Sequence, residues 1–120
     1  MRRLTDLDEL VAKIHATALE TGVFPVGGLR TRVAERAIWR IADGHPDKAF
    51  VHVTVRVGHG RDEATKQRAA AAIFATLCDV LQPAFDAAPL GISLEMQETD
   101  PALSFKKNNL HAYVKERGTA

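Results

Sequence analysis

Two arginines at glycine-rich turns are the side chains in this sequence that are best suited to binding or catalysis. Arg30 ends the stretch "GGLR" and Arg61 ends "GHGR", and both positions let a side chain reach from a turn into a cleft. A guanidinium group stays charged in proteins, and its fork matches a carboxylate in two-point contact. The available chemistry is binding of a small carboxylate, although the local sequence alone favours ordinary solvated loop arginines.

Histidines are the other candidates for proton transfer. His59 lies inside "GHGR", whereas His52 lies within an alternating stretch, where a hydrogen-bonded histidine at a subunit contact is more common than a base. The other three are far apart in the sequence: His15, His45 and His111. No pair has the acid and cysteine neighbours of a zinc site, so we expect no metal. The single cysteine, Cys78, is expected to be a small buried hydrophobe in a reducing compartment.

Composition indicates one globular domain over residues 1–120. Apolar residues make up 46% and charged residues 26% of the chain, close to ordinary globular usage. The formal net charge of +1 supplies no global field, so we expect no nucleic-acid or membrane partner. The stretch "LTDLDEL" after Arg2 and Arg3 has acidic residues where an export signal needs an unbroken apolar region, and no apolar run approaches membrane-spanning length. We therefore expect a cytoplasmic protein.

Hydrophobic periodicity predicts three strands and two helices, with a tail of undetermined state. The expected elements are a helix over 6–20, a strand over 50–57, a helix from 62 to about 81 or a little beyond, and a strand over 90–98. The pattern over 29–41 fits a strand or a helix, and the β-branched and aromatic residues on its apolar face favour the strand. Pro83 marks where the long helix should weaken. The tail carries apolar anchors and is expected to dock: Phe105, Leu110, Tyr113 and Val114.

The succession of strand, long helix and strand in the second half of the chain predicts a βαβ unit, which requires a parallel pair. The helices should cover the valine and leucine faces of these strands. The opposite face, with Phe50, His52, Thr54, Ser93 and Glu95, is half polar, which indicates burial against another subunit. The first half has a helix and then a strand, so a pair of βαβ halves would lack its first strand.

Several blocks of the sequence carry a family resemblance: "TGVFPVGGLRTRV", then "W" and "ADG", then "AFVHVTVRVGHGR", and finally "SFKKNNLHAYVK". In this order and spacing the chain resembles the 5-carboxymethyl-2-hydroxymuconate Δ-isomerase family of the tautomerase superfamily over residues 6–115. The resemblance implies an α+β fold of two βαβ halves with the helices on one face of the sheet. It also implies a homotrimer whose sheets face inward.

The reaction implied by the resemblance is a keto-enol type proton shift on an unsaturated hydroxy-dicarboxylate, in the breakdown of aromatic acids such as homoprotocatechuate. The family needs no metal and no organic cofactor, and its base is the amine of an amino-terminal proline, since an α-amino group titrates near neutrality. Arg30 and Arg61 match the family's substrate-facing arginines, which hold carboxylates and stabilise the developing dienolate. Arg32, Arg36 and Arg40 are expected instead to pair with acids on the sheet or at a subunit boundary.

The sequence departs from the family pattern at its beginning, where Met1 is followed by Arg2 and not by proline. Three explanations stay open: a start codon assigned too far downstream, a shortened paralogue without catalysis, or another base such as the amine of Met1 or a histidine. We expect the chain as printed to have little isomerase activity, and an added strand beginning with proline to restore it.

Two other classes of function remain as alternatives. The chain could be a catalytically inactive module that oligomerises or binds small dicarboxylates. A nucleic-acid-binding role rests only on the even-numbered arginines from Arg30 to Arg40, and the net charge opposes it.

Overall fold

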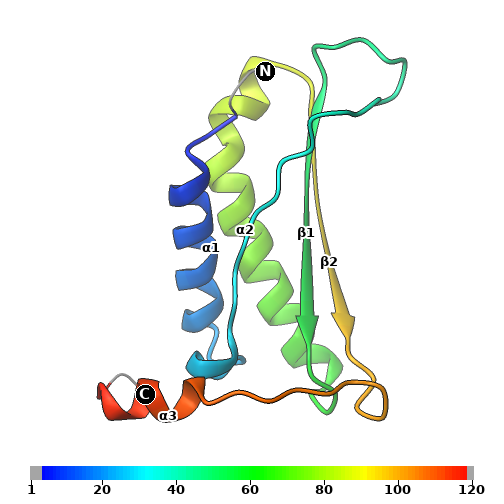
Figure 1. Ribbon diagram of the computed structural model, residues 1–120. Coiled ribbons are helices and arrows are strands. Elements are labelled where there is room, and N and C mark those ends of the chain that lie inside the picture. Colours follow the sequence, from blue (N-terminus) through cyan, green and yellow to red (C-terminus); the bar gives the residue numbers. More distant parts are fainter. Residues whose placement is uncertain (1–3, 119–120) are drawn as a thin grey trace.

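The computed structural model describes residues 4–118 as a parallel pair of strands with helices packed beside it (Figure 1). The elements in chain order are α1 (Leu7–Glu20), the 3₁₀ turn η1 (Val26–Gly28), β1 (Ala49–Val57), α2 (Glu63–Ala87), β2 (Leu90–Glu98) and α3 (Leu110–Glu116). The expected α+β class is confirmed, and both helices of the core lie on one face of the sheet.

Residues next to helix α1 determine where it begins and ends. The Asp6 carboxylate accepts a hydrogen bond from the Glu9 backbone N–H at 3.2 Å, which satisfies one of the free donors of the first turn. The chain leaves the helix through Thr21 and Gly22, and Gly22 has a φ of 72°, a conformation that glycine adopts without strain. The predicted helix over 6–20 is therefore confirmed with its predicted cap.

The βαβ unit is formed by β1, α2 and β2. The two strands pair in parallel along their whole length, from Ala49 opposite Leu90 to Val57 opposite Glu98. Asp62 caps α2 by accepting from the Thr65 N–H at 2.8 Å. The helix passes through Pro83 and ends at Ala87, so it extends further than the sequence predicts. Both strands and their parallel pairing are confirmed.

The core is one layer of side chains between the helices and the sheet. Its most buried members lie on α2, where Ile73, Leu77 and Leu81 are at most 2% exposed. They pack against the α1 stripe of Leu10, Ile14 and Ala18 and against the inward faces of both strands: Val51, Val53, Val55, Ile92 and Leu94. The predicted assignment of the valine and leucine faces to the helices is confirmed.

The prediction of a strand over residues 29–41 is wrong. This segment has no strand structure and contains a bend at Ala37, although it runs along the molecule between α1 and β1 (Figure 1). A strand needs a neighbour for its backbone, and no described residue pairs with this one. Val33 is 48% and Ile38 89% exposed, so the alternation of polar and apolar residues marks no buried face.

The arginines of that segment also differ from expectation. Arg32 and Arg36 are exposed and form no ion pair with any residue in the range 4–118. Arg40 donates from Nη1 to the carbonyl of its neighbour Trp39 at 3.1 Å. Within the described chain these side chains therefore do not pair with acids on the sheet.

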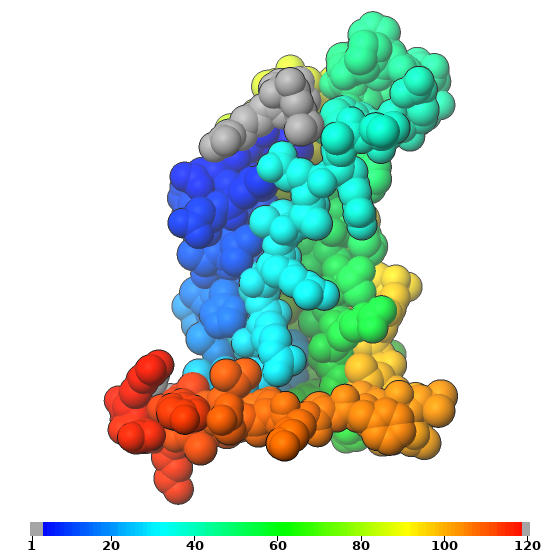
Figure 2. Space-filling view, in the orientation of Figure 1, coloured from blue at the N-terminus to red at the C-terminus, as the bar shows by residue number. Residues whose placement is uncertain are grey.

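The C-terminal part of the chain crosses the carboxyl ends of the strands and docks on η1 (Figures 1 and 2). α3 packs there with His111 against the Gly27–Gly28 pair. A Cβ atom on Gly27 would lie 2.6–2.8 Å from His111 atoms, closer than side-chain carbons come in proteins. Docking therefore requires glycine at position 27. The tail docks as expected, but the prediction of its anchors is wrong for three of the four residues, since Phe105 is 91%, Tyr113 53% and Leu110 42% exposed. Only Val114 is half-buried.

Helix α2 meets the length and composition of a membrane span, with a mean hydropathy of 1.2 in its most apolar window. The expectation that no apolar run approaches this length is therefore wrong. The stripe that carries Ile73, Leu77 and Leu81 packs on α1 and the strands, as in a core helix.

Replacement of Gly27 by alanine is expected to detach α3. The new methyl group must displace His111, including its backbone, whereas Gly28→Ala places a Cβ at ordinary contact distances of 3.7 and 3.8 Å. Amide hydrogen exchange in residues 110–116 should rise at least tenfold in Gly27→Ala and stay near the native rate in Gly28→Ala. Equal protection in the two variants would contradict the tight docking.

Candidate functional site

Most of the candidate functional residues lie near the carboxyl ends of β1 and β2. The turn after β1, residues 58–62, lies at the same end of the molecule as η1 and the segment that leads to α3 (Figure 1). Loops at the carboxyl ends of parallel strands are common positions for binding sites, because the adjoining turns can point side chains into one region.

Arg61 is fixed in this turn by its own guanidinium group. Its Nε and Nη2 donate to the Val23 carbonyl at 3.2 and 2.9 Å, and its Nη1 donates to the Gly58 carbonyl at 3.2 Å. The guanidinium carbon also lies 6.0 Å from the centre of the Phe24 ring. These contacts join the turn after β1 to the connection that follows α1.

The partners of Arg61 leave its charge available. All three hydrogen bonds end on neutral backbone carbonyls, and no carboxylate in the described chain forms an ion pair with this group. A guanidinium has five N–H bonds, so donors remain on both terminal nitrogens. A charged fork held in one orientation without a bound acid is suited to hold an incoming carboxylate.

Arg30 lies two residues beyond η1, on the same connection whose Val23 carbonyl binds Arg61. Its side chain is exposed and forms no hydrogen bond or ion pair with another described residue. Arg30 therefore lies within the segment from 21 to 30, and Arg61 is hydrogen-bonded to the same segment. Arg61 is fixed, while Arg30 is a free surface cation.

A charged cluster beside Arg61 was not predicted as part of the site. His59 Nδ1 lies 3.1 Å from Glu98 Oε2, and Lys66 from α2 forms an ion pair with the other oxygen of Glu98. The hydrogen bond from Lys66 holds the pKa of the Glu98 carboxyl below its usual range, and raises the pKa of Lys66. Only His59 had a sequence signal, its position in "GHGR".

The other histidines have partners or positions away from this turn. His52 Nδ1 lies 2.7 Å from Ser93 Oγ on the exposed face of the sheet, where the two residues are register partners. His15 Nδ1 lies 2.8 Å from Thr31 Oγ1 and ties α1 to the irregular segment. Among residues 4–118 no group of three potential ligands could hold a metal ion. Cys78 is half-buried on α2.

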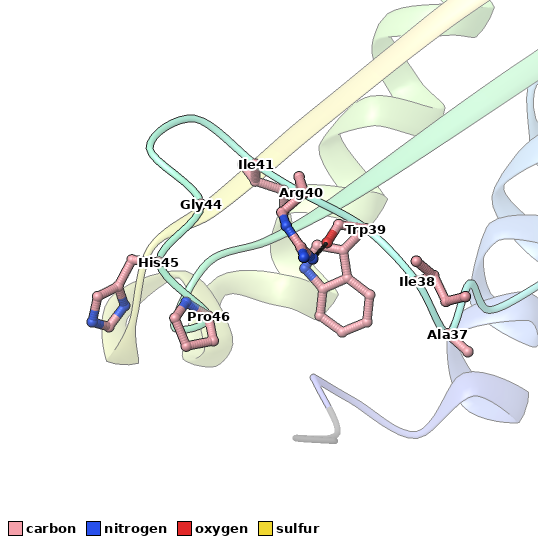
Figure 3. Close-up of a pocket in the computed structure, with 8 residues that line it drawn as sticks. All are labelled: Ala37, Ile38, Trp39, Arg40, Ile41, Gly44, His45 and Pro46. Atoms are coloured by element: carbon pink, nitrogen blue, oxygen red, sulfur yellow. Dashed lines mark hydrogen bonds between the residues drawn. The ribbon is translucent and has the colours of Figure 1, made fainter.

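An open pocket of about 360 Å³ lies far from this turn, at the loop that leads into β1 (Figure 3). A single stretch lines it, namely residues 37–41 and 44–46. Trp39 and Arg40 are among its lining residues, and Lys48 forms an ion pair with Asp43 of the same loop at 2.7 Å. Neither Arg30 nor Arg61 lines this pocket, so it is separate from the predicted site.

A parallel βαβ unit backed by a second helix defines an α+β protein, and an arginine without a carboxylate partner among the described residues lies beside the carboxyl ends of its strands. Comparison with known sequences identifies the family. The profile described as 5-carboxymethyl-2-hydroxymuconate isomerase matches residues 1–114. The chain belongs to the 5-carboxymethyl-2-hydroxymuconate isomerase family.

Individual relatives agree with this assignment. The chain is 37% identical to the 5-carboxymethyl-2-hydroxymuconate Delta-isomerase of Escherichia coli, over 96% of this chain and 91% of that protein. The crystal structure of a 5-carboxymethyl-2-hydroxymuconate isomerase from Deinococcus radiodurans R1 superposes with a TM-score of 0.84 at 37% identity, covering 88% of this chain and 81% of that one. A second crystal structure, of a 5-carboxymethyl-2-hydroxymuconate delta-isomerase, gives 0.83 at 25% identity, over 92% and 83%.

These comparisons confirm the predicted family, the fold class and the expectation that the protein is an isomerase. They give no support to the inactive alternative. The roles of Arg30 and Arg61, the homotrimer and the cytoplasmic location stay predictions.

The Glu98 cluster predicts a stability loss in acid. The pKa of Glu98 is lowered in the folded state. The ionised carboxylate therefore contributes fully to the free energy of unfolding above the ordinary glutamate pKa, and this contribution is lost as the pH falls through the folded-state pKa. Denaturant titrations from pH 7 to pH 2.5 should therefore show a smaller acid loss in Glu98→Gln and in Lys66→Met than in the native chain.

A suitable control is Lys13→Met, which removes an exposed ion pair with Glu9 on α1 and leaves the Glu98 cluster in place. It should retain the native dependence on acid that Glu98 causes. Identical acid curves for the native chain, Glu98→Gln and Lys66→Met would contradict the assignment.

Proposed function

We propose that this chain catalyses the isomerisation of 5-carboxymethyl-2-hydroxymuconate by a keto-enol type proton shift, in the degradation of homoprotocatechuate. The observation that carries the proposal is the fixed guanidinium of Arg61, whose charge no described acid neutralises. Family membership supports the same reaction, since the E. coli relative is a 5-carboxymethyl-2-hydroxymuconate Delta-isomerase.

The chemistry explains why arginine suits this site. The substrate is an unsaturated hydroxy acid with several carboxylates, and loss of its hydroxyl proton spreads negative charge over a dienolate. Arg61, already oriented by backbone carbonyls, stabilises that charge without reorganising during the reaction. Arg30, free at the surface beside η1, binds a substrate carboxylate. No metal or organic cofactor enters this scheme.

The base implied by the family resemblance is an amino-terminal proline. Pro25 cannot fill that role, because its nitrogen belongs to the peptide bond before η1. An activity comparison between the 120-residue chain and a version extended by a strand that begins with proline would test the resemblance on this point.

We propose that the working form is a cytoplasmic homotrimer with the free sheet face turned inward. Phe50 on that face is 57% exposed, and its neighbours His52, Thr54 and Glu95 are exposed as well. Light scattering after size exclusion should give three times the chain mass of 13.1 kDa. A monomer at micromolar concentration would overturn this part of the proposal.

The direct test is the loss of the conjugated dienol absorbance of 5-carboxymethyl-2-hydroxymuconate after addition of the purified protein. The proposal expects ketonisation well above the rate in buffer from the 120-residue chain or from its proline-extended version, with turnover that follows enzyme concentration. A rate equal to buffer for both the 120-residue chain and the proline-extended version would overturn the proposed function.

Replacement of Arg61 by alanine should raise KM and lower kcat together, since the group both binds substrate and stabilises the developing charge. We expect kcat/KM to fall by about 10²–10³, the usual loss for one donor to a developing oxyanion. Steady-state kinetics measures both constants.

Arg68→Ala is the matched control for this loss. Arg68 also donates to a carbonyl of the connection after α1, that of Thr21 at 3.0 Å, but it lies on α2 and outside the glycine turn. It should lose stability as Arg61→Ala does while keeping kcat/KM within about threefold, a change of under 1 kcal/mol. Equal kinetic losses in the two variants would make Arg61 only a structural clamp.

Arg30→Ala should affect binding without affecting folding. Its side chain has no partner among residues 4–118, so the free energy of unfolding should stay within about 0.5 kcal/mol of native. KM should rise by roughly 10- to 100-fold, the value of one charge-assisted hydrogen bond. An unchanged KM would show that Arg30 is an ordinary surface residue.

A further inference from the structure

The aromatic ring of Phe24 lies next to the guanidinium group of Arg61. The guanidinium carbon is 6.0 Å from the centre of the ring, within the range over which a cation and an aromatic ring attract each other. Phe24 is half-buried and packs against the core cluster formed by α1 and α2. The ring therefore connects the charged group to the packed core.

Local structure restricts the position of Phe24. The Thr21 hydroxyl donates to the Ala18 carbonyl at 2.6 Å and accepts from the Val23 backbone N–H at 3.3 Å, so the connection is bound to the end of α1. Pro25 disfavours helical conformations of Phe24, because a proline ring crowds the residue before it. Few backbone conformations therefore remain for Phe24, and its ring has a defined place beside the turn after β1.

The contacts of Arg61 leave its binding capacity intact. Nε and Nη2 donate to the Val23 carbonyl at 3.2 and 2.9 Å, and Nη1 donates to the Gly58 carbonyl at 3.2 Å. These bonds use three of the five N–H groups, so one N–H remains on each terminal nitrogen. An aromatic ring attracts a cation without neutralising its charge, as a carboxylate would. The ring can therefore hold the group in place while its charge stays available.

We propose that Phe24 is a positioning residue that holds the Arg61 guanidinium in the orientation that receives a substrate carboxylate. The inference rests on the function proposed for Arg61. Carbonyl oxygens accept hydrogen bonds over a broad range of directions, so the bonds to Val23 and Gly58 alone let the guanidinium tilt. The ring limits this tilt, and an incoming carboxylate then meets a side chain that has less freedom to lose.

The substitutions must separate positioning from packing, because Phe24 also contributes to the core. Leucine keeps an apolar side chain without an aromatic face, whereas tyrosine keeps the face. Phe24→Leu and Phe24→Tyr are therefore the informative pair, with Phe24→Met in place of Phe24→Leu if the latter does not fold. Val80→Ala is the matched control, since Val80 packs on the same cluster from the second half of α2.

The first test observes the Arg61 Nε–H group by nuclear magnetic resonance in the isotope-labelled chain, with Arg61→Lys to assign the signal. Exchange of this proton with water should be roughly tenfold faster in Phe24→Leu, because its bond to the Val23 carbonyl opens more often. Phe24→Tyr and Val80→Ala should keep nearly the native rate. A native rate in Phe24→Leu, or an equal increase in Val80→Ala, would overturn the role of Phe24.

The second test is a double-mutant cycle on kcat/KM, measured with the 120-residue chain or its proline-extended version. Phe24→Leu should lower kcat/KM about tenfold, and Phe24→Tyr should keep it within about threefold. In the Arg61→Ala background, Phe24→Leu should change kcat/KM by less than about twofold, because the group that it positions is gone.

The two tests separate this inference from the proposed function. Equal losses on Phe24→Leu in the native and Arg61→Ala backgrounds would overturn the positioning role and make Phe24 only a packing residue. Absence of turnover in both versions of the chain would overturn the proposed function, while the exchange rate of the Arg61 Nε proton would still decide whether Phe24 positions the guanidinium.

Discussion

The fold depends on one buried stripe of α2. Ile73, Leu77 and Leu81 contact α1 on one side and the inward residues of both strands on the other. An isolated pair of strands is at best marginally stable in water, because it buries too little apolar surface. The parallel pairing of β1 and β2 therefore depends on the helix between them, and the position of every turn at the carboxyl ends follows from that packing.

The sequence was sufficient for features determined by local periodicity and capping. Asp6 and Asp62 cap their helices as the pattern predicts, and the alternation of β1 and β2 matches the faces they bury. These features need only neighbouring residues, or one face in contact with a core. For the same reason the α+β class, the parallel βαβ unit and the covered face of the sheet were predictable.

Three features that the sequence did not reveal have a common cause, since each depends on a partner distant in the chain. The alternation over 29–41 resembles a strand, but pairing requires a neighbour, and the described chain provides none. Likewise nothing local marks Lys66 as the partner of Glu98, because the two are 32 positions apart and meet only when α2 packs on β2. The Gly27 requirement is similar, since it arises from His111 at the other end of the sequence.

Arg61 shows why the structural and functional interpretations of a loop arginine need not compete. Had its hydrogen bonds ended on a carboxylate, the charge would be neutralised and the site would attract no anion. They end instead on the carbonyls of Val23 and Gly58, which fix the fork and leave its charge in place. The orientation of the group is settled during folding, so an incoming carboxylate orders one long side chain fewer when it binds. The bonds that join two loops of the fold would therefore also preorganise the anion site that we propose at Arg61.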